Sequence, residues 1–148
     1  MNELINAEIW STNLYLSLQV YFEEQQLPIL GSWLNAQAQE NMDRTFQVMS
    51  RICCGNGCVA INEIKREAQK WETALDALNH LIKHEQYMHG LITSLLTLAY
   101  NVDYPSYTFM RKLYEDRIYV STVFIELLHI LAEEGGRRLT WFGDSELN

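Results

Sequence analysis

The chain has 148 residues, of which 48% are apolar, and it contains only 7 Gly and 2 Pro. This composition predicts a single compact domain over residues 1–148, built from long helices rather than from many short strands joined by turns. Nineteen acidic residues against eleven basic ones give a net charge of −8, which argues against nucleic acid and anionic membrane surfaces as partners.

The first residues show no pattern of a secretion signal. Met1 is followed by "NELINAEIW", with acids where a signal would carry basic residues. The apolar stretch "LITSLLTLAY" is too short for a transmembrane helix. We therefore expect a cytoplasmic protein with no membrane segment.

The first two predicted helices cover about residues 2–25 and 28–53. Pro28 separates them, because proline is tolerated in the first turn of a helix but not in its interior. The "GNG" sequence after residue 54 ends the second helix. At steps of three and four, the inner stripes are Leu4, Glu8, Ser11, Tyr15, Leu18 and Phe22 on the first helix, and Leu30, Leu34, Ala38, Asn41, Thr45, Val48 and Ile52 on the second.

Residues 54–71 lack a sustained helical period and are interpreted as a long crossover. Helical periodicity returns over about residues 71–100, "NVDYP" breaks the chain, and a fourth helix is predicted over about 105–134. Gly135 and Gly136 end that helix and leave a short fifth C-terminal segment. Four helices with one long connection, between helices 2 and 3, are typical of an all-α four-helix bundle.

Three cysteines lie close together in "CCGNGC", at Cys53, Cys54 and Cys58. An odd number does not match a secreted disulfide framework, and a thiol-metal site needs a fourth ligand and a different spacing. We expect reduced thiols in a loop, and their role stays open.

Two carboxylates occupy positions that should face the core. Glu85 interrupts an apolar stripe of the third helix, and Glu8 interrupts that of the first. A buried carboxylate costs several kcal/mol unless a cation, a hydrogen-bond network or a proton compensates it. A small rotation of each helix would instead expose both acids, and this alternative stays open.

Di-iron bundles compensate such acids with two iron ions, held by a Glu from each of two helices and a Glu-x-x-His from each of the others. The second helix has "ENMDR" instead. Glu40 is one step from the inner position, Asn41 occupies it, and Arg44 stands where a histidine would be needed. The pattern therefore indicates an incomplete ligand set.

The third helix carries three histidines, His80, His84 and His89. His80 and His84 are four residues apart and could share a metal ion on one helix face. Exposed helix histidines are the commoner arrangement, and we expect that here.

At these residues the chain resembles bacterial ferritins, over nearly its whole length. "NAEIWSTNLY" resembles the first-helix motif of that family, "QAQENMDR" its H-A-Q-E-E-M-x-H pattern and "KHEQ" its third-helix segment. "DYPSYTFM" and "WFGDSEL" are similar to the start of its fourth helix and of its short last helix. The resemblance implies that Glu8 and Glu85 correspond to iron ligands and that Tyr15 lies beside the iron site.

The chain departs from the family pattern at the other ligands. Two ligands of the second helix fall on Asn41 and Arg44, and the glutamine and glutamates of the fourth helix fall on Arg117, Tyr119 and Val120. The paired-iron site would therefore lack its bridging acid and its imidazole.

The remaining acids are Glu8, Glu85, Glu40 and Asp116, of which the last two match acids of a further iron site in the family. These residues would bind iron only weakly, as remnants of the family's sites. Met42 matches the haem-ligating methionine of bacterioferritins, but plain bacterial ferritins carry Met there without haem. We therefore expect no haem.

Two arginines are candidates to replace the metal. Arg44 and Arg117 would direct permanent positive charges at Glu8 and Glu85, because a guanidinium stays protonated and forms planar, paired hydrogen bonds to carboxylates. We predict a structural charge plug, consisting of Arg44, Arg117, Asn41 and Tyr15.

Three functions compete. The first is a ferritin-type iron-storage subunit without its own ferroxidase activity, serving mineral nucleation, shell assembly or co-assembly with an active subunit. The second is a metal-independent bundle for scaffolding or protein binding. The third is a working ferroxidase with rearranged ligands drawn from Glu8, Glu40, Glu85 and Asp116.

We also expect a homo-oligomer. The resemblance implies a shell of about 24 subunits, and aromatic residues appear in excess of what one bundle core needs. These aromatic residues are Trp10, Tyr21, Trp33 and Trp71.

Overall fold

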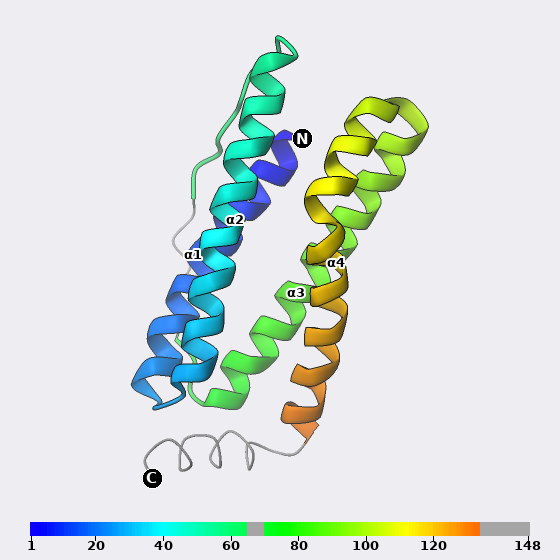
Figure 1. The fold of residues 1–148 in the computed structure, drawn as a ribbon. Coiled ribbons are helices and arrows are strands. Elements are labelled where there is room, and N and C mark those ends of the chain that lie inside the picture. Colours follow the sequence, from blue (N-terminus) through cyan, green and yellow to red (C-terminus); the bar gives the residue numbers. More distant parts are fainter. Residues whose placement is uncertain (65–69, 134–148) are drawn as a thin grey trace. The chain divides into compact units, whose positions relative to one another are not determined.

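The computed structural model describes residues 1–64 and 70–133, except for the side chains at positions 120, 123, 127, 131 and 132. Four α-helices and no strand are present in these described ranges (Figure 1). They are α1 (Asn2–Glu24), α2 (Pro28–Cys54), α3 (Ala74–Val102) and α4 (Tyr104–Glu133). The four predicted helices are confirmed, although α3 begins later than predicted. The predicted fifth segment and the glycines expected to end α4 lie outside the described residues.

The chain forms two compact units, which meet in sequence between Ala74 and Leu75. The first unit contains α1 and α2, and the second contains α3 and α4. The prediction of one domain over residues 1–148 stays a prediction. None of the described helices is long and apolar enough to cross a bilayer.

A tight turn joins α1 to α2. Gln26 adopts a left-handed conformation with φ 61°, and the N–H of Leu27 donates to the carbonyl of Phe22 at 2.8 Å. Pro28 then lies in the first turn of α2, where its missing N–H is not needed. A Cβ at Gly31 would stand 2.9 Å from the Cγ of Glu23, so glycine permits this close approach. The turn therefore holds α1 and α2 as an antiparallel hairpin.

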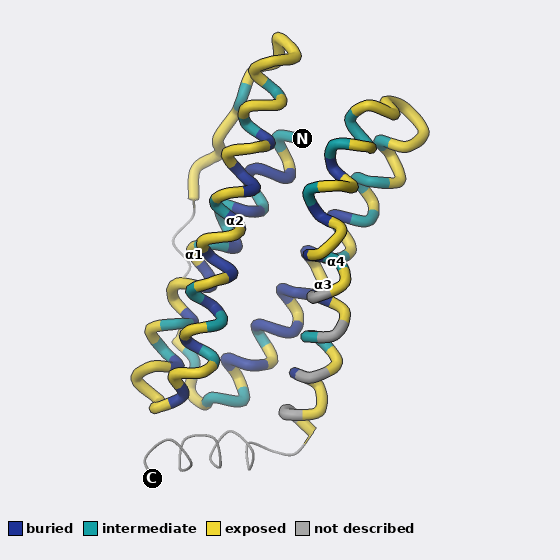
Figure 2. Tube along the Cα trace, in the orientation of Figure 1, coloured by how far each residue is buried: buried dark blue, intermediate teal, exposed yellow. Residues whose placement is uncertain are grey.

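The predicted inner stripe of α1 is buried along its whole length (Figure 2). On α2 the stripe is buried from Leu34 to Val48, whereas Leu30 and Ile52, nearer its ends, are half-buried. The two helices therefore enclose an apolar core, and polar side chains enter it only at particular turns of each helix.

The position at which α2 ends differs from the prediction that the three cysteines lie in a loop. The N–H of Gly57 donates to the carbonyl of Ile52 at 2.9 Å, and Asn56 has φ 57°, which closes the helix after Cys54. Cys53 and Cys54 therefore belong to the last turn of α2 rather than to a loop. Only Cys58 follows the helix, and all three thiols are free and exposed.

The segment after Cys58 runs beside the start of α1 and is held by two asparagine side chains. The Asn2 amide donates to the carbonyl of Cys58 and accepts from the N–H of Ala60, both at 3.0 Å. Asn6 repeats the pattern one helical turn later, donating to the carbonyl of Ala60 at 2.9 Å and accepting from the N–H of Asn62 at 2.7 Å. We call these four hydrogen bonds the asparagine ladder.

The second unit is also a helical hairpin, with its turn reduced to one residue. The predicted break at "NVDYP" was too long, because Asp103 alone separates α3 from α4. Its carboxylate accepts from the N–H of Ser106 at 3.4 Å and from the Ser106 hydroxyl, as a helix N-cap does. Pro105 fits because it lies in the first turn of α4.

The core of the second unit follows one stripe on each helix. On α3 it consists of Leu78, Leu81, Glu85, Met88 and Ile92, and on α4 it includes Met110, Tyr114, Arg117, Ser121 and Leu128. A carboxylate and a guanidinium are therefore both buried in this hairpin.

Candidate functional site

The first buried charge pair joins α1 to α2. Glu8 is fully buried, and its Oε1 lies 3.3 Å from the Nε of Arg44, whose exposed fraction is 7%. The apolar stripe around Glu8 fixes the carboxylate inside the hairpin, and the register of α2 directs Arg44 toward it. The alternative of a rotated, exposed Glu8 is wrong.

Asn41 supports this arginine from the preceding turn of α2. The Nη2 of Arg44 donates to the Asn41 side-chain oxygen, and Thr45 donates to the Asn41 carbonyl at 2.8 Å. The exposed Glu40 lies farther away, with its Oε2 at 3.9 Å from the Nη1 of Arg44. Arg44 is therefore placed between a buried carboxylate and a buried amide.

The second buried charge pair joins α3 to α4. The Nη1 of Arg117 lies 2.9 Å from the Oε2 of Glu85, and its Nη2 lies 3.4 Å from Oε1, so the guanidinium contacts both oxygens. Ser121 adds a third donor, with its hydroxyl 3.2 Å from Oε2. Glu85 is fully buried, so the alternative that a rotation of the helix exposes this acid is also wrong.

Ser121 was not among the predicted site residues. It lies four residues after Arg117, so it shares the same face of α4. That spacing was the available signal, but a serine at such a position more often bonds to the helix backbone.

Tyr15 is fully buried two turns along α1 from Glu8. Its ring meets that of Trp33 edge to face, with centroids 6.4 Å apart. The structure thus places Tyr15 in the core between α1 and α2.

His84 is buried, with an exposed fraction of 5%, so the expectation of an exposed histidine is wrong for this residue. Burial lowers the pKa of His84 to about 4, against the opposing effect of the Glu85 carboxylate, and Arg117 and His80 lower this pKa further. His84 is therefore neutral near pH 7. His80 and His89 are half-buried.

The two other predicted iron-binding acids lie at the surface. Glu40 on α2 and Asp116 on α4 are both exposed. Within the described ranges, no group of three or more His, Cys, Asp or Glu side chains is arranged to hold a metal ion. The structure thus brings Glu8 to Arg44 and Glu85 to Arg117, rather than bringing acids together within either unit.

Sequence comparisons link the chain to ferritins. A protein-family model described as a ferritin-like domain matches residues 1–129. The bacterial non-heme ferritin of Bacteroides fragilis is 32% identical over 99 residues, covering 67% of this chain and 62% of that protein. The match with this chain thus spans less than two thirds of that relative's length. The bacterial non-heme ferritin of Campylobacter jejuni is 25% identical over 139 residues, covering 91% of this chain and 83% of that protein.

Solved structures show the same fold. An open-pore ferritin from the archaeon Archaeoglobus fulgidus has a TM-score of 0.76 and 26% identity, with 97% of this chain and 90% of that chain covered. A form of that ferritin engineered to be closed has a TM-score of 0.74 and 25% identity, with 99% and 92% covered. The predicted fold class, an all-α, ferritin-like four-helix bundle, is confirmed. The chain therefore belongs to the ferritin-like domain family and is similar to bacterial non-haem ferritins.

Proposed function

We propose that this chain is a ferritin-type, shell-forming subunit of iron storage that lacks a ferroxidase centre of its own. The pair of buried arginine contacts carries the part of the proposal that concerns the missing ferroxidase centre, and the match to the ferritin-like family supports the storage role. Arg44 stands 3.3 Å from Glu8, and Arg117 stands 2.9 Å from Glu85. Each guanidinium supplies the positive charge that a metal would otherwise bring to its carboxylate.

These contacts do not fit a paired-metal site. An Fe(II) ion at either carboxylate would have to displace a guanidinium that cannot lose its proton. The displaced arginine would then remain as a buried, uncompensated charge, which costs several kcal/mol. Asn41 and Ser121 offer only neutral oxygens, which add no charge to hold a second ion.

Iron in this proposal is cargo rather than a resident cofactor. The net charge of −8 favours accumulation of cations at the surface of an assembly. Exposed carboxylates such as Glu40 and Asp116 are suited to weak contacts with iron or to nucleation of a mineral. Oxidation would be supplied by an active ferritin subunit in the same shell, or would proceed slowly at the mineral.

Rapid mixing of the purified protein with Fe(II) in air tests whether the chain lacks a ferroxidase centre. We expect the initial phase of oxidation to be no faster than in buffer. A fast burst that consumes two irons per subunit would show that other residues have replaced the ligands, as in the rearranged ferroxidase.

Iron retention tests storage against the scaffolding alternative. After prolonged incubation with Fe(II) in air, iron should elute with the large assembly on size exclusion. An assembly that retains no iron would favour a metal-independent scaffold, for which the arginine pairs are equally suitable.

A further inference from the structure

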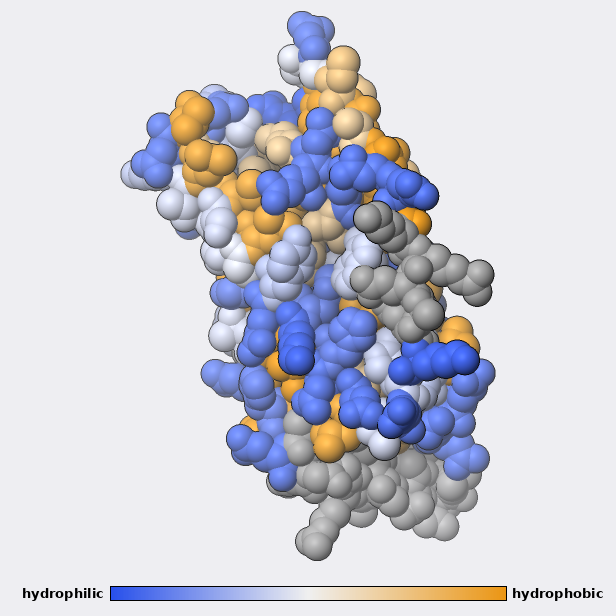
Figure 3. Space-filling view, turned by 180° about the vertical axis from the view of Figure 1, so that it is seen from behind, coloured by the Kyte–Doolittle hydropathy of each residue, from blue (hydrophilic) through white to orange (hydrophobic). Residues whose placement is uncertain are grey.

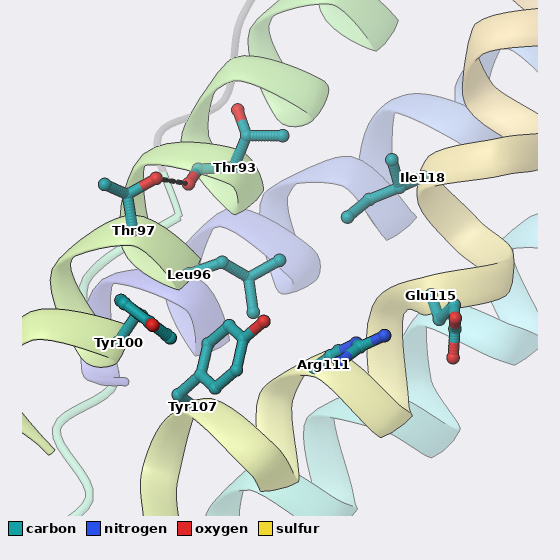
Figure 4. Close-up of a pocket in the computed structure, with 8 residues that line it drawn as sticks. All are labelled: Thr93, Leu96, Thr97, Tyr100, Tyr107, Arg111, Glu115 and Ile118. Carbon is teal, nitrogen blue, oxygen red and sulfur yellow. Dashed lines mark hydrogen bonds between the residues drawn. The ribbon is translucent and has the colours of Figure 1, made fainter. Parts of the chain in front are cut away.

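A pocket of about 460 Å³ opens between α3 and α4 in the second unit (Figure 4). Its volume falls within the range of about 300–1,000 Å³ that is usual for small-molecule sites. It is separate from the charge pairs, since neither Glu85 nor Arg117 lines it. The lining residues are Thr93, Leu96, Thr97, Tyr100, Tyr107, Arg111, Glu115 and Ile118.

Aromatic rings form the end of the pocket nearest the α3–α4 turn. Tyr100 and Tyr107 meet edge to face with centroids 5.1 Å apart, and Tyr104 lies 6.0 and 5.6 Å from them. Leu96 and Ile118 add aliphatic surface from the two helices (Figure 4). Such walls suit a flat, largely apolar molecule.

Exposed apolar residues also occur elsewhere at the α3–α4 end of the unit. Leu98 and Val102, near the same turn, have exposed fractions of 59% and 75%. Figure 3 shows apolar residues gathered on this end of the unit, at the upper left. At 100° per residue, Leu98 and Val102 lie on another face of α3 than the lining residues Thr93, Leu96 and Tyr100, so they do not extend the pocket.

Two polar groups of the pocket are available to donate to a ligand. The hydroxyls of Thr93 and Thr97 already donate to backbone carbonyls at 2.9 and 3.0 Å. The Arg111 guanidinium and the Tyr107 hydroxyl make no hydrogen bond or ion pair to another described residue. These two groups can therefore donate to a bound ligand.

Glu115 is the acid among the lining residues. Figure 4 shows its carboxylate turned away from Leu96 and Ile118, whereas Arg111 lies between Tyr107 and Glu115 along α4. Negative charge on a ligand would therefore be attracted by Arg111 and opposed, from farther out, by Glu115. A guanidinium is suited to this role because it binds carboxylate and sulfonate oxygens in a planar, paired arrangement.

We propose that this pocket binds a small amphipathic anion. Its flat apolar body would pack against Leu96, Tyr107 and Ile118, and its carboxylate or sulfonate would contact Arg111. The site is independent of iron, because none of the residues that bind the ligand takes part in the buried charge pairs.

Fluorescence titration of the assembled wild-type protein tests the proposal with two matched probes. The first is 1-anilinonaphthalene-8-sulfonate, and the second is N-phenyl-1-naphthylamine, which has the same ring system without the sulfonate. We expect saturable binding of the sulfonate probe and weaker binding of the neutral one. No saturable binding of the sulfonate probe to the assembled protein overturns the proposal.

Substitutions of neighbouring charges locate the anion. Arg111→Gln should weaken binding of the sulfonate probe about tenfold or more and leave the neutral probe unchanged, since a charge-assisted contact is lost. Glu115→Gln should strengthen binding of the sulfonate probe, because it removes a carboxylate that repels the anion. Lys112→Gln is the control, because Lys112 is also an exposed cation on α4 but does not line the pocket. Equal weakening by Arg111→Gln and Lys112→Gln would show an effect of net charge alone and would overturn the site.

A substitution that fills the pocket with a larger side chain tests whether the probes bind there. Leu96→Trp should abolish binding of both probes while the helical circular dichroism and the assembly size stay those of the wild type. Unchanged binding in this variant would place the probes elsewhere and contradict the proposal. If Leu96→Trp disturbs the fold, Ile118→Phe, on the opposite wall, serves the same purpose with a smaller change.

Discussion

At the scale of single residues, burial and pairing determine what Glu8 and Glu85 can do. Both carboxylates are fully buried, and each lies within hydrogen-bond distance of a guanidinium. A buried ion pair adds little net stability compared with apolar packing, but the loss of one partner leaves an uncompensated charge. The arginines are therefore expected to be essential for folding stability.

Replacement of Arg117 should be strongly destabilising. Arg117→Leu leaves Glu85 buried without its bidentate partner, and we expect the free energy of unfolding to fall by about 3–5 kcal/mol. Urea denaturation midpoints measure the loss. The exposed Lys112 provides the control, since Lys112→Leu should change the free energy of unfolding by less than about 1 kcal/mol.

The double variant Arg117→Leu with Glu85→Gln should recover part of that loss, because a buried amide costs less than a buried unpaired carboxylate. Small, additive effects of the two single changes would mean that the pair contributes no coupling energy. In that case the proposed replacement of a metal by arginine would lose its energetic basis.

Burial of His84 predicts a pH dependence of stability. The pKa of His84 is lowered to about 4, whereas an unfolded histidine titrates near 6.5. Between these values the unfolded chain binds the proton and the folded chain does not, so stability falls as the pH drops from about 6.5 to 4. We expect this group to contribute a loss of about 3 kcal/mol over that range.

Urea midpoints at a series of pH values measure this effect. His84→Gln should flatten the profile between pH 6.5 and 4. His129→Gln, at an exposed histidine, should keep the wild-type slope. Identical slopes in wild type and His84→Gln would show that His84 is accessible to protons in the folded protein.

The sequence was informative about some of these residues and not about others. The stripe positions of Glu8 and Glu85 correctly indicated that both would be buried. Ser121 was missed and His84 was expected to be exposed, because both residue types are usually solvated or bonded locally on a helix. Their burial depends on which flank of each helix the opposite helix covers, and periodicity alone does not specify that.

At the scale of elements, the apolar period located all four helices, but it located their ends less well. α3 begins at Ala74 rather than at Trp71, and Asp103 replaces the longer break that "NVDYP" indicated. The signals at "DYP" are real, since Asp103 caps α4 and Pro105 lies in its first turn. An Asp followed by a Pro is also common in loops, but here α4 begins directly after Asp103.

The asparagine ladder holds the segment from Cys58 to Asn62 beside α1, and its removal should loosen that segment. In the double variant Asn2→Ala and Asn6→Ala, four hydrogen bonds to the backbone are lost. We expect limited proteolysis to cut between residues 58 and 64 faster than in the wild type. Exposed Ile61 and Ile64 offer cleavage positions in this stretch.

Asn13→Ala is the control for the ladder, because among the described residues the Asn13 amide bonds only to the carbonyl of Ile9 in its own helix. Its cleavage rate should match that of the wild type. If the double variant is cut no faster than this control, other contacts hold the segment.

At the scale of the whole molecule, the evidence for a shell comes from the family rather than from surface aromatic residues. Trp10, Tyr21, Trp33 and Trp71 are half-buried in the first unit rather than fully exposed. Tyr21 contacts Trp71 with ring centroids 5.3 Å apart, so these two residues pack against each other within the chain. The sequence argument from excess aromatic surface was therefore weak.

The family relationship still predicts a large assembly. Static light scattering should give a mass of about 24 chains, as the resemblance to bacterial ferritins implies. A monomer at micromolar concentration would remove both the shell and the storage role. It would leave the arginine pairs intact, because each joins two helices of one unit.

The central claim is that arginine replaces metal at Glu8 and Glu85. An anomalous-scattering map from crystals soaked in Fe(II), recorded at the iron edge, tests it most directly. We predict no iron peak beside either carboxylate and ordered guanidinium groups of Arg44 and Arg117 in their place, with any iron confined to surface acids. Iron peaks bound to Glu8 and Glu85, with both arginines displaced, would contradict the account.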